Sequence, residues 1–314
     1  MNRYFKSFFW GSLIISLFSS SYLLYYKLTD GFRIASITSH LTYHPQWETQ
    51  SPTPDEKFLL TTILDQPYSY LGKGGKAYAF QSKDGLYVLK FFKFKYLRPN
   101  FLNQLISKIP FFEGKNTHEM QRRHRKFYGV YQGYKWAYDL NKTHSGLIYL
   151  HLNPTFNQFG YVDLYDKLGR KHSLDLDQVV FMVQKKARLF NEILAEKLDK
   201  GNVTDAQVMI FKVIDMFVNQ YQKGLYDRDL GVLHNTGFVD DRPIHFDMGK
   251  MTYDESMKDV AHYKAHLILV SNKIDGWIKN HYPQFYPGLH KTLEDKLSTV
   301  FNEKFQFALD LNAI

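Results

Sequence analysis

The amino-terminal part of the chain contains an uncharged run over positions 7–26, and this run constrains the fold more than any other segment. A helix of that length just crosses a bilayer core of about 30 Å. Trp10 near one end and three tyrosines near the other are typical of the aromatic belts at a membrane interface. We therefore predict a transmembrane anchor over residues 1–30, a single-pass membrane protein, and the membrane as a partner through residues 7–26.

Two other interpretations of this run stay open. Arg3 and Lys6, the apolar stretch and the small residues at 19–21 are also typical of a cleaved signal peptide. A buried helix of a soluble domain is the third possibility. The apolar run continues past the cleavage site, which favours the anchor. Basic residues flank the run on both sides, with Lys27 and Arg33 after it, so the sequence leaves the side of the membrane undetermined.

Composition favours a folded protein and removes several kinds of site. The chain is 44% hydrophobic and 23% charged, which is the opposite of the signature of disorder. Cysteine is absent, which excludes disulfides, cysteine-liganded zinc and a thiol nucleophile. The formal net charge of +9 favours anionic partners such as nucleotide phosphates or lipid headgroups. We expect no nucleic-acid partner, because no basic surface with interleaved aromatic residues is evident.

The pattern of apolar residues changes twice after the anchor. Residues 31–65 mix prolines with Thr, Ser and His without periodicity, and we predict a stalk there. Short apolar runs predict strands at 68–71, 77–81, 86–92, 147–152, 161–166 and 179–183, a hairpin turn at Asp84-Gly85, and one helix at 118–140. Longer periodic runs predict helices at 187–198, 205–221, 253–278 and 289–309, the second capped by Thr204 and stopped by Gly224. The sequence therefore predicts an α+β protein with a mostly antiparallel β lobe at 66–185 and a helical lobe at 186–314.

The turn between the first two predicted strands is rich in glycine, at Gly72, Gly74 and Gly75. Glycines let backbone amides approach an anion closely and point at it, as phosphate-binding loops require. A hairpin turn also uses glycine, so the cluster alone has two interpretations. Lys90 on the third predicted strand stands among apolar neighbours. Its ammonium either meets phosphate oxygens in a cleft or points to solvent on the outer face.

Two acidic segments follow the second helix predicted for the helical lobe. Residues 227–229 read Asp-Arg-Asp, with Asn235 further on, and residues 247–249 read Asp-Met-Gly. Carboxylate and amide oxygens are ligands that magnesium prefers, and a carboxylate can accept a hydroxyl proton. An exposed turn with a local ion pair is the alternative for the first segment. His234 and His245 have no partner at metal-ligand spacing, and we interpret them as structural.

In this order the motifs resemble those of the protein-kinase-like superfamily: a glycine-rich loop, a strand lysine, an R-D-x-x-x-x-N loop after a long helix, and an Asp-x-Gly motif. The resemblance covers roughly residues 68–251 and implies a two-lobed kinase-like fold that uses ATP and Mg²⁺. It implies that Asp229, as a catalytic residue, orients the attacking hydroxyl, and that Lys90, the other catalytic residue, binds phosphate. It further assigns nucleotide binding to Gly72, Gly74, Gly75, Lys90 and Glu119, with Glu119 orienting Lys90, and it assigns magnesium binding to Asn235 and Asp247.

The chain departs from the family pattern at several positions. Ala77 replaces a glycine of the loop, Asp227 stands where a histidine is usual, and Met248 replaces a phenylalanine. Asn235 lies one residue further from Asp229 than in that pattern, and no Ala-Pro-Glu motif follows. The remainder resembles compact bacterial or small-molecule kinases. We predict a membrane-anchored ATP-dependent phosphotransferase whose phosphate acceptor is unknown. The alternatives are a pseudokinase that binds nucleotide or a partner without turnover, and a basic membrane-surface interaction protein.

Overall fold

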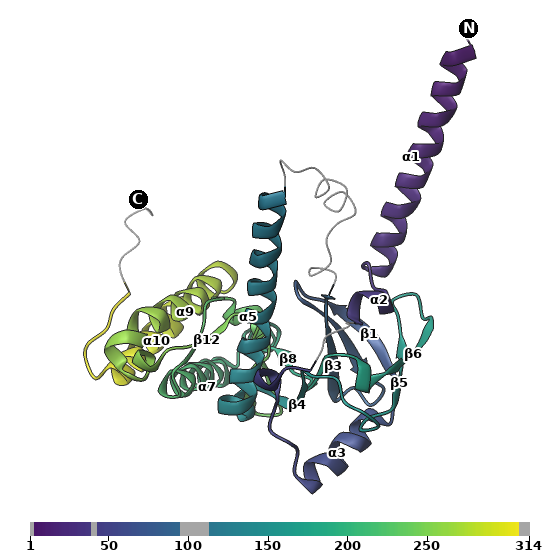
Figure 1. Ribbon diagram of the computed structural model, residues 1–314. Coiled ribbons are helices and arrows are strands. Elements are labelled where there is room, and N and C mark those ends of the chain that lie inside the picture. Colours follow the sequence, from purple (N-terminus) through teal and green to yellow (C-terminus); the bar gives the residue numbers. More distant parts are fainter. Residues whose placement is uncertain (1–2, 39–42, 95–112, 308–314) are drawn as a thin grey trace. The chain divides into compact units, whose positions relative to one another are not determined.

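The structure of the protein, a computed structural model, describes residues 3–38, 43–94 and 113–307 (Figure 1). It is a mixed α+β chain that divides into two compact units. Unit 1 comprises residues 1–48, 52–100 and 151–182, and unit 2 comprises residues 49–51, 101–150 and 183–314. These units do not coincide with the predicted lobes at 66–185 and 186–314. The amino-terminal segment belongs to the β-rich unit, and residues 101–150 belong to the helical unit.

A curled sheet forms the core of unit 1. β1 (Tyr68–Lys73), β2 (Ala77–Ser82) and β3 (Tyr87–Phe92) are antiparallel neighbours, which confirms three predicted strands. The predicted Asp-Gly turn joins β2 to β3, and Gly85 adopts a left-handed φ of 76° there. β5 (Tyr161–Tyr165) lies parallel to β1, and β6 (Lys171–Asp175) completes the order β3-β2-β1-β5-β6. The sequence does not predict β6, because its residues are mostly polar and only one of them is buried.

In place of the predicted stalk at 31–65, unit 1 has short helices that pack against its sheet. They are α2 (Ile34–Ile37), a 3₁₀ turn (Pro45–Trp47) and α3 (Pro54–Leu64). A capping box begins α3, in which Thr53 and Glu56 each bind the backbone N–H of the other. Phe32 is 2% exposed, and its ring meets those of Tyr78 and Phe80 edge-on at 5.2 and 5.1 Å. These side chains are too widely spaced to show a period, so only the tertiary packing reveals their burial.

The predicted anchor is the helix α1 (Arg3–Thr29). Among the described residues, its segment Phe8–Thr29 is the one helix long and apolar enough to cross a membrane. None of its most apolar window is buried, whereas the core helix of a soluble domain is mostly buried. A signal sequence also passes this test of length and composition. The helix α1 therefore fits both a transmembrane anchor and a cleaved signal peptide.

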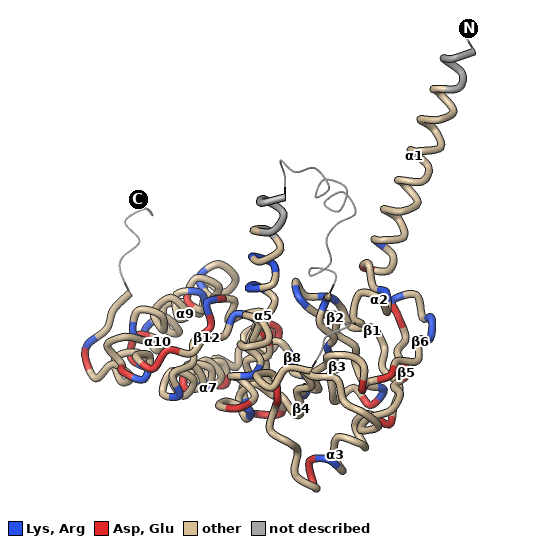
Figure 2. The backbone as a smooth tube through the Cα atoms, in the orientation of Figure 1, with Lys and Arg blue, Asp and Glu red and all other residues tan. Residues whose placement is uncertain are grey.

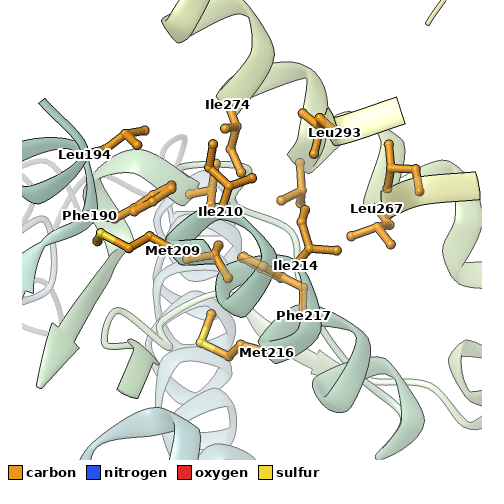
Figure 3. Close-up of a cluster of buried hydrophobic side chains, with 14 of the residues drawn as sticks. Phe190, Leu194, Met209, Ile210, Ile214, Met216, Phe217, Leu267, Ile274 and Leu293 are labelled. Atoms are coloured by element: carbon orange, nitrogen blue, oxygen red, sulfur yellow. The ribbon is translucent and has the colours of Figure 1, made fainter. Parts of the chain in front are cut away.

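Unit 2 is mainly helical. Its longer helices are α5 (Glu113–Ser145), α6 (Phe190–Asp199), α7 (Val203–Gln222), α9 (Val260–His281) and α10 (Tyr286–Phe301). α7 is the centre of the core, because its buried face contacts side chains of α6, α9 and α10 (Figure 3). Ile214 of α7 and Leu267 of α9 are each completely buried. Burial of such a side chain contributes about 1.5–3 kcal/mol, so these contacts fix the helices of the unit.

The ends of these helices differ in part from the predicted ends. α7 begins after Asn202 and not after Thr204, while Gly224 stops it as predicted, with a φ of 74°. α10 begins three residues before the predicted start, because Pro287 lies in its first turn, where a missing N–H removes no helical bond. α10 ends at Phe301, followed by Asn302 with a left-handed φ of 53°. The predicted end at 309 lies outside the described residues.

Short strands arrange the acidic segments of unit 2. β9 (Leu225–Asp227) pairs with β12 (Met251–Tyr253), and β10 (Thr236–Val239) pairs with β11 (Arg242–His245) and β8 (Arg188–Leu189). The one-turn helix α8 (Val232–Asn235) separates β9 from β10 in the sequence. Strands this short produce no alternation, so the sequence predicts none of them. β4 (Leu147–His151) and β7 (Phe181–Lys185) confirm two predicted strands and cross the boundary between the units.

Candidate functional site

The first acidic segment leaves β9 at a buried carboxylate. Asp227 is 1% exposed, and its Oδ2 lies 3.0 Å from Nε2 of His245, which is equally buried. The other oxygen, Oδ1, accepts the backbone N–H of Asp229 at 2.9 Å. Asp227 therefore does not belong to an exposed turn, and it fixes the backbone from which Asp229 projects. His245 lies in the interior of unit 2, against Asp227.

A half-buried histidine, His266, holds the same segment from the other side. His266 donates from Nε2 to the carbonyl of Asp227 at 2.8 Å, and its Nδ1 lies 2.7 Å from the hydroxyl of Tyr221. Burial lowers the pKa of His266, which favours the neutral ring that donates at one nitrogen and accepts at the other. The turn after β9 is thus bound to α7 and α9 through hydrogen bonds.

Asp229 itself is partly open to solvent and binds a lysine, Lys250, that none of the predicted motifs includes. Its Oδ2 accepts from Nζ of Lys250 at 2.8 Å, with the two side chains 39% and 59% exposed. This hydrogen bond raises the pKa of Lys250, and the charges of Asp227 and Asp247 act in the same direction. Lys250 is therefore a stable cation among three carboxylates. In the sequence Lys250 directly follows the Asp-x-Gly motif, but only the turn before it directs its side chain to Asp229.

The second acidic segment is held by hydrogen bonds to backbone and side chains. Oδ1 of Asp247 accepts the hydroxyl of Tyr134 at 3.3 Å and the backbone N–H of Gly249 at 3.2 Å. Burial raises the pKa of Tyr134 well above its usual value, so this hydroxyl keeps its proton. Gln184 is 1% exposed and donates to the carbonyl of Phe246 at 3.2 Å. The carboxylate of Asp247 is exposed on a backbone that is fixed on both sides.

α5 approaches the second segment through a glycine. A Cβ on Gly133 would lie 2.4 Å from the carbonyl oxygen of Met248 and 3.3 Å from the backbone nitrogen of Met251. Real Cβ atoms do not come this close to backbone oxygen, so the contact requires glycine at this helical position. Met248 is completely buried, which places Asp247 at the edge of the α5 contact.

Asn235 joins the two segments. Its carbonyl accepts the N–H of Phe246 at 2.9 Å, directly before Asp247. Its side-chain Nδ2 lies 2.8 Å, and Oδ1 of Asp229 3.3 Å, from the point that a Cβ of Gly231 would occupy. The predicted residues Asp229, Asn235 and Asp247 are therefore brought together within unit 2. We call these three residues with Lys250 the acidic cluster.

The donor atoms of the acidic cluster fit a magnesium ion better than a zinc ion. Asp247 offers carboxylate oxygens and Asn235 an amide oxygen, which are hard ligands of the kind that magnesium takes together with water and phosphate. In the described part of the chain, no group of three or more His, Cys, Asp or Glu residues is placed to bind a metal ion. Magnesium bound here would take its remaining ligands from phosphate or water.

The glycine-rich turn and Lys90 lie in unit 1. Gly72 pairs with Ala79, and the N–H of Gly74 donates to the carbonyl of Ala77 at 2.9 Å. Lys90 is half-buried on β3, opposite Ala79 of β2. Glu119 lies within α5, in unit 2, and its side chain is outside the described residues. Its predicted pairing with Lys90 stays a prediction.

A second lysine of unit 1, which none of the predicted motifs includes, fixes the glycine-rich turn. Lys93 is 3% exposed, and its Nζ donates to the carbonyl of Gly74 at 2.5 Å while it lies 4.3 Å from the ring centre of Tyr78. A Cβ on Gly72 or Gly75 would meet no atom within 4 Å, and neither residue has a positive φ. The fold of unit 1 therefore does not require glycine at these two positions.

A cavity of unit 2 is separate from the acidic cluster. Its volume is about 600 Å³, and it is lined by the end of α5, by β4 and by the β10–β11 turn. Its charged residues are Lys142, Lys185, Asp240, Asp241 and Arg242. None of the predicted site residues lines this cavity.

No protein-family model and no curated protein matches the chain. Among solved structures, it is similar to a medium-resolution structure of the bifunctional kinase-methyltransferase WbdD, with 16% identity and a TM-score of 0.34, over 70% of this chain and 42% of that chain. A co-crystal structure of WbdD with a kinase inhibitor gives 15% identity and the same TM-score of 0.34, over 72% of this chain and 45% of that chain. The chain thus spans less than half the length of these proteins, and a TM-score of this size does not assign a fold.

Proposed function

We propose that the protein is a membrane-anchored phosphotransferase of kinase-like type that uses magnesium and ATP. The acidic cluster carries the proposal, because Asp229, Asn235 and Asp247 come from two segments and converge in unit 2. The buried contact of Asp227 with His245, at 3.0 Å, joins the ends of β9 and β11, from which the two segments continue. Carboxylates that are open to solvent on a backbone held by hydrogen bonds are available to a ligand, and this favours a chemical role for them.

In this proposal each residue of the acidic cluster has its own task. Asp229 accepts or orients the proton of the attacking hydroxyl, since its carboxylate is partly exposed on a fixed turn. Asn235 and Asp247 hold Mg²⁺, which when bound neutralises charge on the nucleotide phosphates. Lys250 is a cation within reach of Asp229 and is suited to bind the phosphoryl group that is transferred.

The residues of unit 1 bind nucleotide in this proposal. Gly72, Gly74 and Gly75 approach the phosphates, and Lys90 contacts their oxygens. The open space around Gly72 and Gly75 supports this role, because the fold gives no other reason for glycine there. α1 anchors the protein in the membrane, which its length, composition and exposure support.

Magnesium-dependent ATP binding by the full chain in detergent tests the nucleotide site. We expect thermal stabilisation of the wild type, about 2.7 kcal/mol at a ligand concentration of 100 times Kd. Asp247→Asn and Lys90→Ala should remove it, whereas Asp241→Asn, which changes a carboxylate that is 87% exposed on the β10–β11 turn, should keep it. Equal stabilisation of the wild type and Asp247→Asn would show that this carboxylate holds no magnesium.

A pseudokinase is the second candidate, and one observation favours it. The carboxylate of Asp229 is already bound to Lys250 at 2.8 Å, as in a site whose base is occupied. Transfer of labelled γ-phosphate to water or to an acceptor separates the two candidates. Transfer that Asp229→Asn abolishes would exclude the pseudokinase, and tight nucleotide binding without any transfer would favour it.

A further inference from the structure

We propose that a ring of cations at the base of α1 binds anionic lipid headgroups and holds unit 1 against the membrane surface. The ring, which we call the basic collar, consists of Lys27, Arg33, Lys73, Lys167 and Arg170. Figure 2 shows basic residues around the base of α1, near α2 and β6. This inference rests on the proposed membrane anchor and is independent of the proposed chemistry.

The end of α1 is bound to unit 1 and is not a loose linker. Asp30 forms ion pairs with Lys73 and Lys167, each at 3.1 Å, and it accepts the hydroxyl of Tyr70 at 3.0 Å. The hydroxyl of Tyr78 donates to the carbonyl of Gly31 at 2.8 Å. These contacts join the two residues directly after α1 to β1, β2 and the β5–β6 turn. A membrane that holds α1 therefore also fixes the distance of unit 1 from its surface.

The tyrosines at the end of the uncharged run contact cations of the collar. The guanidinium groups of Arg33 and Arg170 lie 5.6 and 6.0 Å from the ring centre of Tyr25. Nζ of Lys73 lies 4.9 Å from the ring centre of Tyr26. Interfacial tyrosines place their rings at headgroup level, so the cations bound to them lie at the same depth.

The length of α1 also places the basic collar at the depth of the lipid headgroups. At about 1.5 Å per residue, the uncharged run 7–26 covers roughly 30 Å, which is the thickness of the hydrocarbon core. The collar begins with Lys27, directly after this run, where the headgroup layer begins.

The collar has a surplus of positive charge. Its five cations face two carboxylates, Asp30 and Asp166, of which Asp166 is only 2% exposed. The side chains of Lys73, Lys167 and Arg170 are 34%, 43% and 48% exposed. Lys171 and Asp163, nearby on β6 and β5, pair with each other at 2.8 Å and add no net charge. The surplus of three charges fits an anionic surface.

Folding thereby changes the charge balance across α1. In the sequence, Lys27 and Arg33 after the run match Arg3 and Lys6 before it. In the structure, Lys73, Lys167 and Arg170 join the side that bears unit 1. We therefore expect unit 1 to lie on the side of the membrane whose leaflet carries anionic lipid.

The absence of native cysteine allows a direct test on the full chain. A fluorophore on Leu168→Cys, at a residue 47% exposed between Lys167 and Arg170, reports on the collar. The same fluorophore on Phe58→Cys, 77% exposed on α3, reports on the end of unit 1 away from α1 (Figure 1). The chain is reconstituted into phosphatidylcholine vesicles, with or without phosphatidylglycerol, that contain a quencher on the lipid headgroup.

We expect quenching at position 168 to rise with phosphatidylglycerol and to fall with added salt, with little change at position 58. Lys27→Gln with Arg33→Gln should shift the docked-to-undocked ratio about fivefold per cation removed. Lys57→Gln with Lys83→Gln is the matched control, because it removes the same charge from α3 and from the β2–β3 turn beside it. This control should leave quenching at position 168 unchanged.

Three results would overturn the proposal that the basic collar binds anionic lipid. The first is equal quenching at position 168 with and without phosphatidylglycerol. The second is a rise in quenching with phosphatidylglycerol that is equal at positions 168 and 58. The third is a loss of quenching at position 168 that is equal in the collar variant and in its control. Flotation of the chain with neutral vesicles tests the anchor separately. A chain that does not float refutes the anchor, whereas a chain that floats without lipid-dependent quenching refutes the collar alone.

Discussion

Asp227 and His245 are paired inside unit 2, with Oδ2 of Asp227 3.0 Å from Nε2 of His245 and each side chain 1% exposed. β9 ends at Asp227 and β11 ends at His245, so the pair joins the two chain segments that lead to the acidic cluster. Among the described residues, no donor is aligned to hydrogen-bond to this oxygen, and the His245 ring is what compensates it.

Breaking the pair from either side should cost about 3–5 kcal/mol of unfolding free energy, because the partner is left buried without compensation. We expect this for Asp227→Ala and for His245→Ala, measured by urea denaturation. The double variant should lose less than the sum of the two, since no unpaired group remains. Asp241→Ala, at an exposed carboxylate, is the control and should change stability by less than about 0.5 kcal/mol. Strictly additive losses would show that the two residues act independently.

Gly133 should be required for the position of Asp247. Gly133→Ala places a Cβ 2.4 Å from the carbonyl oxygen of Met248, and relief of this contact must move the backbone of the Asp-x-Gly motif. We expect a loss of about 1–3 kcal/mol of stability and weaker magnesium-dependent nucleotide binding. Gly129→Ala is the matched control one turn earlier in α5, where a Cβ meets nothing within 4 Å.

The Gly129→Ala control should stabilise the protein by about 0.5–1 kcal/mol, because alanine has a higher helix propensity than glycine. Nucleotide binding should not change in this variant. Unfolding curves and nucleotide titrations of both variants give the comparison. Similar behaviour of Gly133→Ala and Gly129→Ala would mean that α5 does not set the position of the motif.

Local patterns predict much of the fold. The alternating residues of β1, β2 and β3 and the Asp-Gly turn carry their own signal, as do the periodic apolar faces of α7 and α9. The burial of Phe32 has no such signal, because it depends on contacts with Tyr78 and Phe80 of β2, far along the chain. The predicted helix at 253–278 begins too early, since Tyr253 pairs with Leu225 in β12 and Asp259 caps the true start of α9.

In the candidate site, too, some features follow from the sequence and others depend on tertiary contacts. Spacing along the chain predicts that Asp229, Asn235 and Asp247 belong together, and the structure brings them together in unit 2. Spacing does not predict that His245 binds Asp227, because this depends on how two short strands are placed. It also does not predict Lys250, whose role comes from the direction of its side chain toward Asp229. A lysine directly after an acidic motif has no meaning until the turn before it is known.

Lys250 should be needed for transfer more than for nucleotide binding. Its pKa is raised by the hydrogen bond to Asp229, so it stays charged across the neutral range and can stabilise a transferring phosphoryl group. We expect Lys250→Met to lower the rate of transfer about 100-fold or more and to change nucleotide affinity little. Lys212→Met is the control, because Lys212 pairs with Asp241 elsewhere in unit 2. Faster transfer in Lys250→Met would instead make this lysine an inhibitor that occupies Asp229.

A substitution in the glycine-rich turn should lower nucleotide affinity without lowering the stability of the protein. Gly75→Ala meets open space at a negative φ, so its stability should match or exceed that of the wild type by about 0.5–1 kcal/mol, while nucleotide affinity falls. Gly85→Ala has the opposite signature, because Gly85 has a left-handed φ of 76° in the β2–β3 turn. It should lower stability and leave affinity unchanged in the folded protein. Unchanged affinity in Gly75→Ala would count against phosphate binding by this turn.

His151 should make the protein less stable in mild acid. Burial lowers its pKa from 6.5 to about 4, although its hydrogen bond to the carbonyl of Val179 at 2.8 Å and the charge of Asp177 act in the other direction. Above pH 6.5 the ring is neutral in both states and contributes no pH dependence. Below that, the unfolded chain binds a proton that the folded chain refuses until about pH 4, so stability is lost across this window. The shift corresponds to about 3 kcal/mol.

Other groups titrate in the same window, among them His266, whose pKa burial also lowers, so the test compares two variants. His151→Gln removes one titration and should flatten the loss of unfolding free energy between pH 6.5 and pH 4 by up to about 3 kcal/mol. His262→Gln, at a ring 58% exposed, should keep the slope of the wild type. Urea denaturation at a series of pH values gives these slopes. Equal slopes in both variants would show that His151 takes up its proton as readily in the folded chain as in the unfolded one.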